Sequence, residues 1–192
     1  MARYPIAEIF YSIQGEGRWV GKPMIFIRLA GCSVKSCHIR KECDTDWSHG
    51  KSNELKEIVD IVRNLPGKTV SITGGEPTDH DLSPLLEALD SYDIHLETSG
   101  IRAAPSVDWL TVSPKTFNYS QRSGDALKIV MRPEWSWHEI DTLAFDSSFK
   151  YYYLQPLTVN EHPVNMEQVL NMVQDRPTWQ VSIQAHRLWR IR

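Results

Sequence analysis

The three cysteines of this chain all lie between positions 32 and 43, at Cys32, Cys37 and Cys43. Thiolates clustered in one loop are typical metal ligands, and an odd number of cysteines cannot form a complete disulfide framework. The spacing Cys-x4-Cys-x5-Cys contains no CxxC pair and so differs from common zinc sites, although His38 or His49 could supply zinc with a fourth ligand. Thiolates also bind iron–sulfur clusters. Three cysteines could hold three irons of a four-iron cluster and leave the fourth iron open.

Short polar motifs follow the predicted strands at the points where those strands end. They are Gly31-Cys32, Gly74-Gly75-Glu76-Pro77, Thr98-Ser99-Gly100, Ser113-Pro114-Lys115 and Gln155-Pro156. In parallel α/β folds, ligands bind at the carboxyl ends of the strands. We therefore expect these five motifs to meet at one rim.

Arg28 stands inside an otherwise apolar predicted strand. Burying a guanidinium is costly unless it is paired. The carboxylate of a bound substrate would be a suitable bidentate partner. A structural salt bridge to an internal Asp or Glu is the alternative.

Apolar-rich segments predict buried, mostly parallel strands at Pro5–Tyr11, Met24–Leu29, Thr69–Thr73, Ile94–Glu97, Trp109–Val112, Ala126–Met131, Tyr151–Leu154 and Trp179–Ile183. Apolar stripes of helical period predict helices over 55–65, 82–89, 137–144 and 166–173, with Ser52 as the N-cap of the first. Alternating strands and helices favour an α/β fold with a parallel sheet and right-handed crossovers.

The length of 192 residues predicts one domain, residues 1–192, with a cysteine loop at 31–47. A complete α/β barrel takes about 250 residues, so we expect a partial, TIM-like barrel of about six core strands with few helices. The net charge of −3 argues against nucleic-acid binding. No apolar run approaches the ~20 residues of a membrane helix, and no signal-peptide core is visible. These features predict a soluble, cytoplasmic protein.

The motifs and their order closely resemble the 7-carboxy-7-deazaguanine synthases, which are radical S-adenosylmethionine (SAM) enzymes. The resemblance spans nearly the whole chain and rests on the segments Phe10–Gly17, Phe26–Cys32, Cys43-Asp44-Thr45, Thr73–Pro77, Glu97–Gly100, Ser113–Lys115 and Leu154–Pro156. The GGEP motif alone indicates only the wider superfamily, whereas SIQGEG together with CDT is far more specific. The cysteine spacing departs from the superfamily's three residues and then two.

This resemblance implies conversion of 6-carboxy-5,6,7,8-tetrahydropterin to 7-carboxy-7-deazaguanine with loss of ammonia, a lyase step in queuosine or modified-base biosynthesis. It implies a 4Fe-4S cluster, SAM and Mg²⁺ as cofactors. The implied partners are a small pterin substrate, a reductant protein such as a flavodoxin, and a second copy of the chain in a homodimer.

The resemblance also assigns roles to particular residues, and none is catalytic beyond the cluster and SAM. The implied cluster ligands are Cys32, Cys37 and Cys43, and the implied Mg²⁺ ligand is Thr45. The implied SAM contacts are Glu42, Asp44, Gly74, Gly75, Glu76, Ser113, Pro114, Lys115 and Gln155. The implied substrate contacts are Ile13, Gln14, Gly15, Glu16, Arg28, Thr73, His186 and Arg192. A carboxylate such as Glu16 can accept hydrogen bonds from the amide-and-amine edge of a pterin.

Two other functions compete with this interpretation. Another radical SAM enzyme, such as a glycyl-radical activase, would need a surface for docking a protein and would not need SIQGEG or a buried Arg28. A non-enzymatic zinc module would use the cysteines and a histidine, and would be colourless. A four-iron cluster would instead give brown protein after anaerobic preparation.

Overall fold

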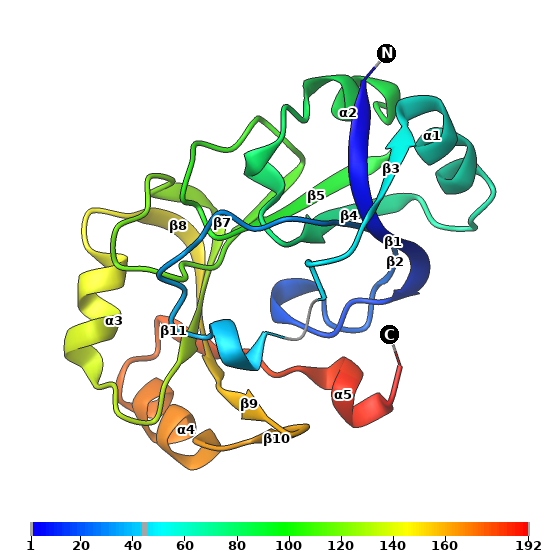
Figure 1. Ribbon diagram of the computed structural model, residues 1–192. Coiled ribbons are helices and arrows are strands. Elements are labelled where there is room, and N and C mark those ends of the chain that lie inside the picture. The colour runs from blue at the N-terminus through cyan, green and yellow to red at the C-terminus, as the bar shows by residue number, and fades with distance from the viewer. Residues whose placement is uncertain (1, 44–45, 192) are drawn as a thin grey trace.

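The computed structural model of the protein describes residues 2–43 and 46–191. Its main element is a nine-stranded sheet in the order β11-β8-β7-β6-β5-β4-β2-β1-β3 (Figure 1). The strands are β1 (Arg3–Ile13), β2 (Pro23–Leu29), β3 (Lys51–Glu54), β4 (Thr69–Gly74), β5 (Asp93–Thr98), β6 (Trp109–Val112), β7 (Ser123–Met131), β8 (Ser148–Pro156) and β11 (Trp179–Val181). A separate two-stranded sheet pairs β9 (Thr158–Val159) with β10 (His162–Pro163).

Seven strands of this sheet pair in parallel rather than about six, and they are β2, β4, β5, β6, β7, β8 and β11. The other two strands differ, because β1 runs antiparallel to β2 and β3 runs antiparallel to β1. The sheet has two edges, β11 and β3. The structure therefore supports an α/β fold with a mostly parallel sheet and few helices, and the described residues form an open sheet.

Four helices pack against one face of the sheet and bury its apolar side chains. They are α1 (Leu55–Arg63), α2 (Ser83–Ala88), α3 (Trp137–Ala144) and α4 (Met166–Asp175). Their buried residues, such as Ile58, Leu85, Ile140 and Val169, join one core cluster with the sheet. A fifth helix, α5 (Ala185–Trp189), lies apart from them near the end of the chain (Figure 1). Among the described residues, no helix is long and apolar enough to cross a membrane.

The start of α1 differs from its prediction. Ser52 belongs to β3, where it pairs with Pro5, and Glu54 is the N-cap of the helix. Glu54 and Glu57 form a capping box. The Glu54 side chain accepts a hydrogen bond from the Glu57 backbone, and the Glu57 side chain accepts one from the Glu54 backbone. The prediction was wrong because the polar strand β3 carries no apolar pattern of its own.

The pairing of β1 with β2 contains a bulge between Ile6 and Glu8. In a regular strand, side chains two residues apart point to the same face. Here Ile6 packs in the core beneath the helices, whereas Phe10 packs with Met24 and Phe26 in a second cluster. The bulge therefore turns the second half of β1 so that its even-numbered residues lie on the face away from the helices.

Candidate active site

A cavity of about 210 Å³ lies at the carboxyl ends of the parallel strands. The strand-end motifs meet there, as expected, and they contribute Cys32, Gly74, Gly75, Thr98, Ser99, Ser113, Lys115, Gln155 and Pro156 to its wall. Side chains on the helix-free face of β1 and β2 complete it, among them Phe10, Phe26 and Arg28. A cavity of this kind, with polar groups converging from several strands, is the usual form of a ligand site in α/β folds.

All three cysteines line this cavity, although they come from different parts of one long loop. The residues between Cys37 and Cys43 include a short 3-10 helix, η2 (Arg40–Glu42). Burial raises the pKa of the Cys32 thiol, so a bound cation is needed to favour its thiolate. Within residues 2–43 and 46–191, no three Cys, His, Asp or Glu side chains gather closely enough for a single metal ion. Ligands spread around one cavity fit a polynuclear cluster, whose irons each take a different thiolate.

His38 is occupied in holding this loop to the body of the protein. Its Nδ1 lies 2.9 Å from the carbonyl oxygen of Lys115, and its Nε2 lies 3.2 Å from that of Val130. The ring also packs on Trp135, at 4.6 Å between centroids. Burial and the nearby Lys115 lower the pKa of His38 to about 4, so the ring is neutral at pH 7. With both nitrogens facing carbonyls, His38 is not arranged as a zinc ligand.

The Gly74-Gly75 pair lets the end of β4 pass against the start of the cysteine loop. A Cβ on Gly74, whose φ is +125°, would lie 2.1 Å from the Leu29 carbonyl oxygen. A Cβ on Gly75 would lie 1.7 Å from the Gly31 carbonyl oxygen. That same oxygen accepts a hydrogen bond from the Glu76 backbone N–H at 2.9 Å. Close backbone packing therefore requires both glycines, in addition to any ligand at the cavity.

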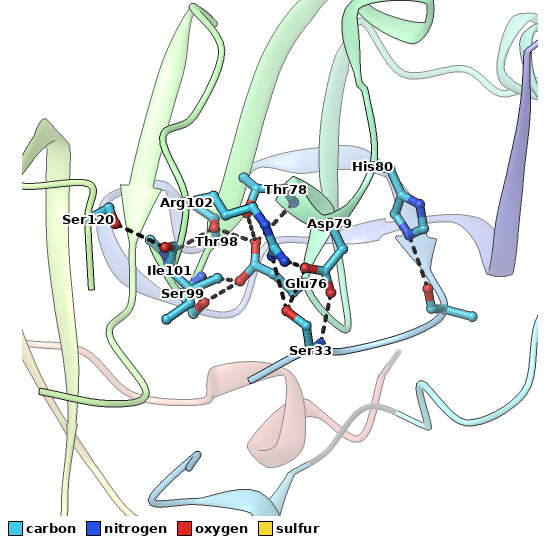
Figure 2. Close-up of polar contacts among 12 residues, drawn as sticks. Ser33, Glu76, Thr78, Asp79, His80, Thr98, Ser99, Ile101, Arg102 and Ser120 are labelled. Carbon is cyan, nitrogen blue, oxygen red and sulfur yellow. Dashed lines mark hydrogen bonds and ion pairs between the residues drawn. The ribbon is translucent and has the colours of Figure 1, made fainter. Parts of the chain in front are cut away.

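The Glu76 carboxylate joins the ends of β4 and β5 (Figure 2). It is fully buried, with 0% of the residue exposed. Thr78 donates to it from its backbone N–H at 3.0 Å and its hydroxyl at 2.7 Å, and the Thr98 hydroxyl donates at 2.5 Å. Ser99 donates from its backbone N–H at 2.8 Å and from its hydroxyl. Glu76 is thus turned into the protein and does not line the cavity, although its neighbour Gly75 does.

A second polar network fixes the residue after Cys32 (Figure 2). Asp79, in the short helix η3 (Pro77–Asp79), accepts hydrogen bonds from the Ser33 backbone N–H at 2.8 Å and the Ser33 hydroxyl at 2.6 Å. Arg102 forms an ion pair with the same carboxylate and donates to the Ser33 hydroxyl at 3.0 Å. The loops after β2, β4 and β5 are therefore tied together beside the first cysteine.

The cavity floor contains a buried ion-pair network around Lys128. Lys128 projects from β7, is 5% exposed, and pairs with Glu16 and, at 3.2 Å, with Glu97. Gln14 donates to Glu97 at 2.8 Å. Burial opposes the charged forms of Glu16 and Lys128, but their mutual attraction outweighs it, lowering the pKa of Glu16 to about 2 and raising that of Lys128. Both groups are therefore charged at pH 7.

Two amides hold the other oxygen of Glu16. Gln184 donates to Oε1 at 2.9 Å, and Gln155, which is 3% exposed, donates at 3.2 Å. The sequence analysis missed Lys128, Glu97 and Gln184 as site residues. Lys128, like Arg28, is a charged residue inside an apolar predicted strand, and this pattern could have identified it as a site residue.

The C-terminal segment closes one side of the cavity by packing on the SIQGEG loop. The Ala185 backbone N–H donates to the Gly15 carbonyl oxygen at 2.9 Å. His186 lies against Gly15, where a Cβ would be 2.2 Å from its Nδ1. Residues nearly the whole chain apart in sequence thus form one wall.

Arg28 lines the cavity and is also paired with a carboxylate. Its Nη1 donates to Glu8 Oε1 at 2.6 Å across the β1–β2 pairing, and its guanidinium lies 5.4 Å from the Phe10 ring centroid. The parallel register places Thr73 beside Arg28 on β4. The salt bridge expected as the alternative for Arg28 is therefore observed, and binding of a substrate carboxylate stays a prediction.

Most of the predicted site residues described by the structure line this single cavity. They are Ile13, Gln14, Gly15, Glu16, Arg28, Cys32, Cys37, Glu42, Cys43, Thr73, Gly74, Gly75, Ser113, Lys115, Gln155 and His186. Glu76 and Pro114 stand behind the wall rather than in it. Asp44, Thr45 and Arg192 lie outside the described residues.

Comparison with known proteins bears on this arrangement directly. The chain is 36% identical to a 7-carboxy-7-deazaguanine synthase of Bacteroides thetaiotaomicron, over 97% of this chain and 98% of that protein. A Synechocystis protein of the same name is 32% identical over 98% of this chain and 94% of its own. The chain belongs to the 7-carboxy-7-deazaguanine synthase family.

The fold agrees with that family. The crystal structure of QueE from Escherichia coli superposes with a TM-score of 0.74 and 27% identity, covering 96% of this chain and 95% of that one. No family model matches the chain. The chain thus shares the fold and nearly the full length of this solved structure, and its family is one of radical SAM enzymes.

Proposed function

We propose that this protein converts 6-carboxy-5,6,7,8-tetrahydropterin to 7-carboxy-7-deazaguanine with release of ammonia. The observation that carries the proposal is the cavity itself. Its rim holds three cysteines, and its floor holds an ionised Glu16 and a guanidinium, Arg28. A carboxylated pterin offers hydrogen-bond donors at one edge and an anion at the other, and these two groups complement it.

Other residues of the chain hold Glu16 in a fixed position. Lys128, Gln155 and Gln184 fix the carboxylate in place, and the pKa of about 2 keeps it an acceptor. We propose that Glu16, with Gln14 and backbone groups at Ile13 and Gly15, reads the pterin edge. Arg28 takes the substrate carboxylate, and Thr73 and His186 complete the contacts.

We propose that Cys32, Cys37 and Cys43 bind a 4Fe-4S cluster. When bound together with SAM, such a cluster would supply the electron for a radical that takes a hydrogen atom from the substrate. The chain's own part is to position the ligands and exclude water. Gly74, Gly75, Ser113, Lys115 and Gln155 border the proposed SAM site, and Glu76 and Pro114 support them from behind the cavity wall. Lys115 is held there by donating to the Ser113 hydroxyl at 2.5 Å and carbonyl at 3.0 Å.

The remaining expectations extend this proposal. We propose that Mg²⁺ assists through Thr45, that Glu42 and Asp44 contact SAM, and that Arg192 reaches the substrate. A reductant protein such as a flavodoxin supplies electrons in the cytoplasm, and two copies of the chain form a homodimer. Size-exclusion chromatography with light scattering measures the last point directly.

The decisive experiment is anaerobic turnover of the reconstituted protein with carboxytetrahydropterin, SAM, Mg²⁺ and a reductant. The expected result is 7-carboxy-7-deazaguanine and ammonia in equal amounts, detected by mass spectrometry and an ammonia assay. Arg28→Ala should retain its iron but lose substrate affinity. A reconstituted cluster that cleaves SAM yet yields no deazaguanine would overturn the substrate assignment.

A further inference from the structure

Glu8 lies immediately behind Arg28, outside the wall of the cavity. The β1–β2 register sets the two residues directly opposite each other, and they pair at 2.6 Å. Glu8 is not part of the cavity lining, whereas Arg28 is, so we consider the function that Glu8 can exert through that guanidinium.

The bulge in β1 is what brings Glu8 to this position. Without it, Glu8 would share a face with Ile6 and point toward the helices, where a carboxylate would be buried in an apolar core. Bulges commonly re-aim a side chain next to an active site. The irregularity in β1 therefore has a definite result, which is a carboxylate held against Arg28.

The pairing leaves one edge of the guanidinium unused. Glu8 accepts a hydrogen bond from Arg28 Nη1. The Nε atom of Arg28 is buried and has no hydrogen-bond partner in the part of the chain that the structure describes. A buried donor without a partner is costly. A guanidinium binds a carboxylate best through two parallel N–H groups, and the Nε–Nη2 edge is a pair of that kind.

We propose that Glu8 is a positioning residue that fixes Arg28 by Nη1 and so presents its Nε–Nη2 edge to the substrate carboxylate. The Phe10 ring, 5.4 Å from the guanidinium, limits its tilt. This inference rests on the proposed function and names the group that gives Arg28 its orientation. It predicts that the chain selects carboxylated pterins by geometry as well as by charge.

The test compares two probes, 6-carboxypterin and pterin, which differ only by the carboxyl group. Calorimetric titration into the reconstituted protein with SAM but no reductant gives the ratio of the two affinities without turnover. Hydrogen bonds to a charged group predict a ratio of about tenfold or more in the wild type. Glu8→Ala should reduce this ratio to below about threefold, because Arg28 loses its fixed orientation.

Matched variants separate positioning from other effects. Glu8→Gln keeps an oxygen acceptor for Nη1 and should retain the wild-type ratio. Arg28→Lys keeps the charge without the fork and should lose it. Arg3→Ala breaks another cross-strand Arg–Glu pair, Arg3 with Glu54 at 2.6 Å, away from the cavity, and should change nothing.

Two kinds of result would contradict the positioning role of Glu8. A Glu8→Ala protein with the full ratio, or a Glu8→Gln protein that loses it as completely as Glu8→Ala, would overturn the positioning role while leaving the proposed function intact. A wild-type protein that binds both pterins equally would instead overturn the assignment of Arg28 to the substrate carboxylate, and the inference with it.

Discussion

Gly15 and His186 occupy adjoining space so completely that a methyl group on Gly15 would lie 2.2 Å from His186 Nδ1 and 2.7 Å from the His186 backbone nitrogen. Because one of these atoms belongs to the backbone, the side chain alone cannot relieve the overlap. The glycine of the SIQGEG segment is therefore a packing requirement for α5. The wall of the cavity depends on it.

Gly15→Ala should displace α5 and weaken binding of the substrate, at a cost of about 1–3 kcal/mol in stability, as overpacking usually does. Limited proteolysis should cut the C-terminal segment of the variant sooner than that of the wild type. Leu188→Ala, at a residue 68% exposed on the same helix, serves as the control and should leave the cleavage rate unchanged. Equal protection of Gly15→Ala and wild type would contradict the packing role.

Because Glu16 is ionised in the folded protein, we expect the free energy of unfolding to fall at acid pH. Its folded pKa of about 2 lies below the ordinary glutamate pKa of about 4.3, so its contribution to stability is present above that pH and is lost as the pH falls toward 2. A shift of this size corresponds to roughly 3 kcal/mol at most. Urea unfolding at a series of pH values should show this decline in the wild type and a flatter profile in Glu16→Gln.

Lys128→Met tests the other side of the same network. Removing the ammonium leaves Glu16 and Glu97 close together without their cation, which should cost about 3–5 kcal/mol. Lys150→Met, which removes an exposed partner of Asp125, should leave the urea midpoint close to that of the wild type. Urea midpoints at pH 7 measure both, and equal losses in the two variants would rule out a special role for the buried pair.

His38→Ala should weaken retention of the cluster without unfolding the protein. The ring holds the loop between Cys37 and Cys43 against the carbonyl oxygens of Lys115 and Val130, and the variant loses these two contacts while it keeps the one from Arg132. The measurement is iron per chain after gel filtration, with circular dichroism as the check on folding. His49→Ala, at an exposed histidine just after the cysteine loop, is the matched control. Unchanged iron content in His38→Ala would show that the anchor is dispensable.

Glu76→Gln should destabilise the protein by about 1–3 kcal/mol, because an amide nitrogen would then face groups that can only donate. The backbone N–H groups of Thr78 and Ser99 are such donors. Glu87→Gln, at an exposed position on α2, gives the control. Thermal unfolding measures the difference, and identical midpoints would mean that the network rearranges freely.

The sequence predicted the elements that are defined by apolar pattern. All eight strand segments and four helical stripes are present, because buried strands and amphipathic helices each need a regular set of apolar residues. It missed β3, whose four residues Lys51–Glu54 are polar and whose pairing is decided by β1. The antiparallel start of the sheet was likewise invisible, since local pattern does not encode strand direction.

The candidate site was predictable where a residue stood out from its surroundings. Arg28 and the cysteines did so, whereas the partners that hold Glu16 come from β7, β8 and the C-terminal segment. Such partners depend on the tertiary fold rather than on spacing. For example, the Gly-Gly-Glu-Pro motif correctly predicted a turn at the site, but it did not indicate that the Glu76 carboxylate faces the protein interior.

The five-residue gap between Cys37 and Cys43 has a consequence for the order of assembly. The protein holds it through the His38 ring, which lies 3.2 Å from the Val130 carbonyl oxygen, and through Arg132, which donates to the His38 carbonyl oxygen. In zinc-finger domains, by contrast, the metal supplies the folding free energy. This chain should fold first and receive its inorganic centre afterwards, so that a molecule stripped by oxygen remains a folded acceptor that can be refilled.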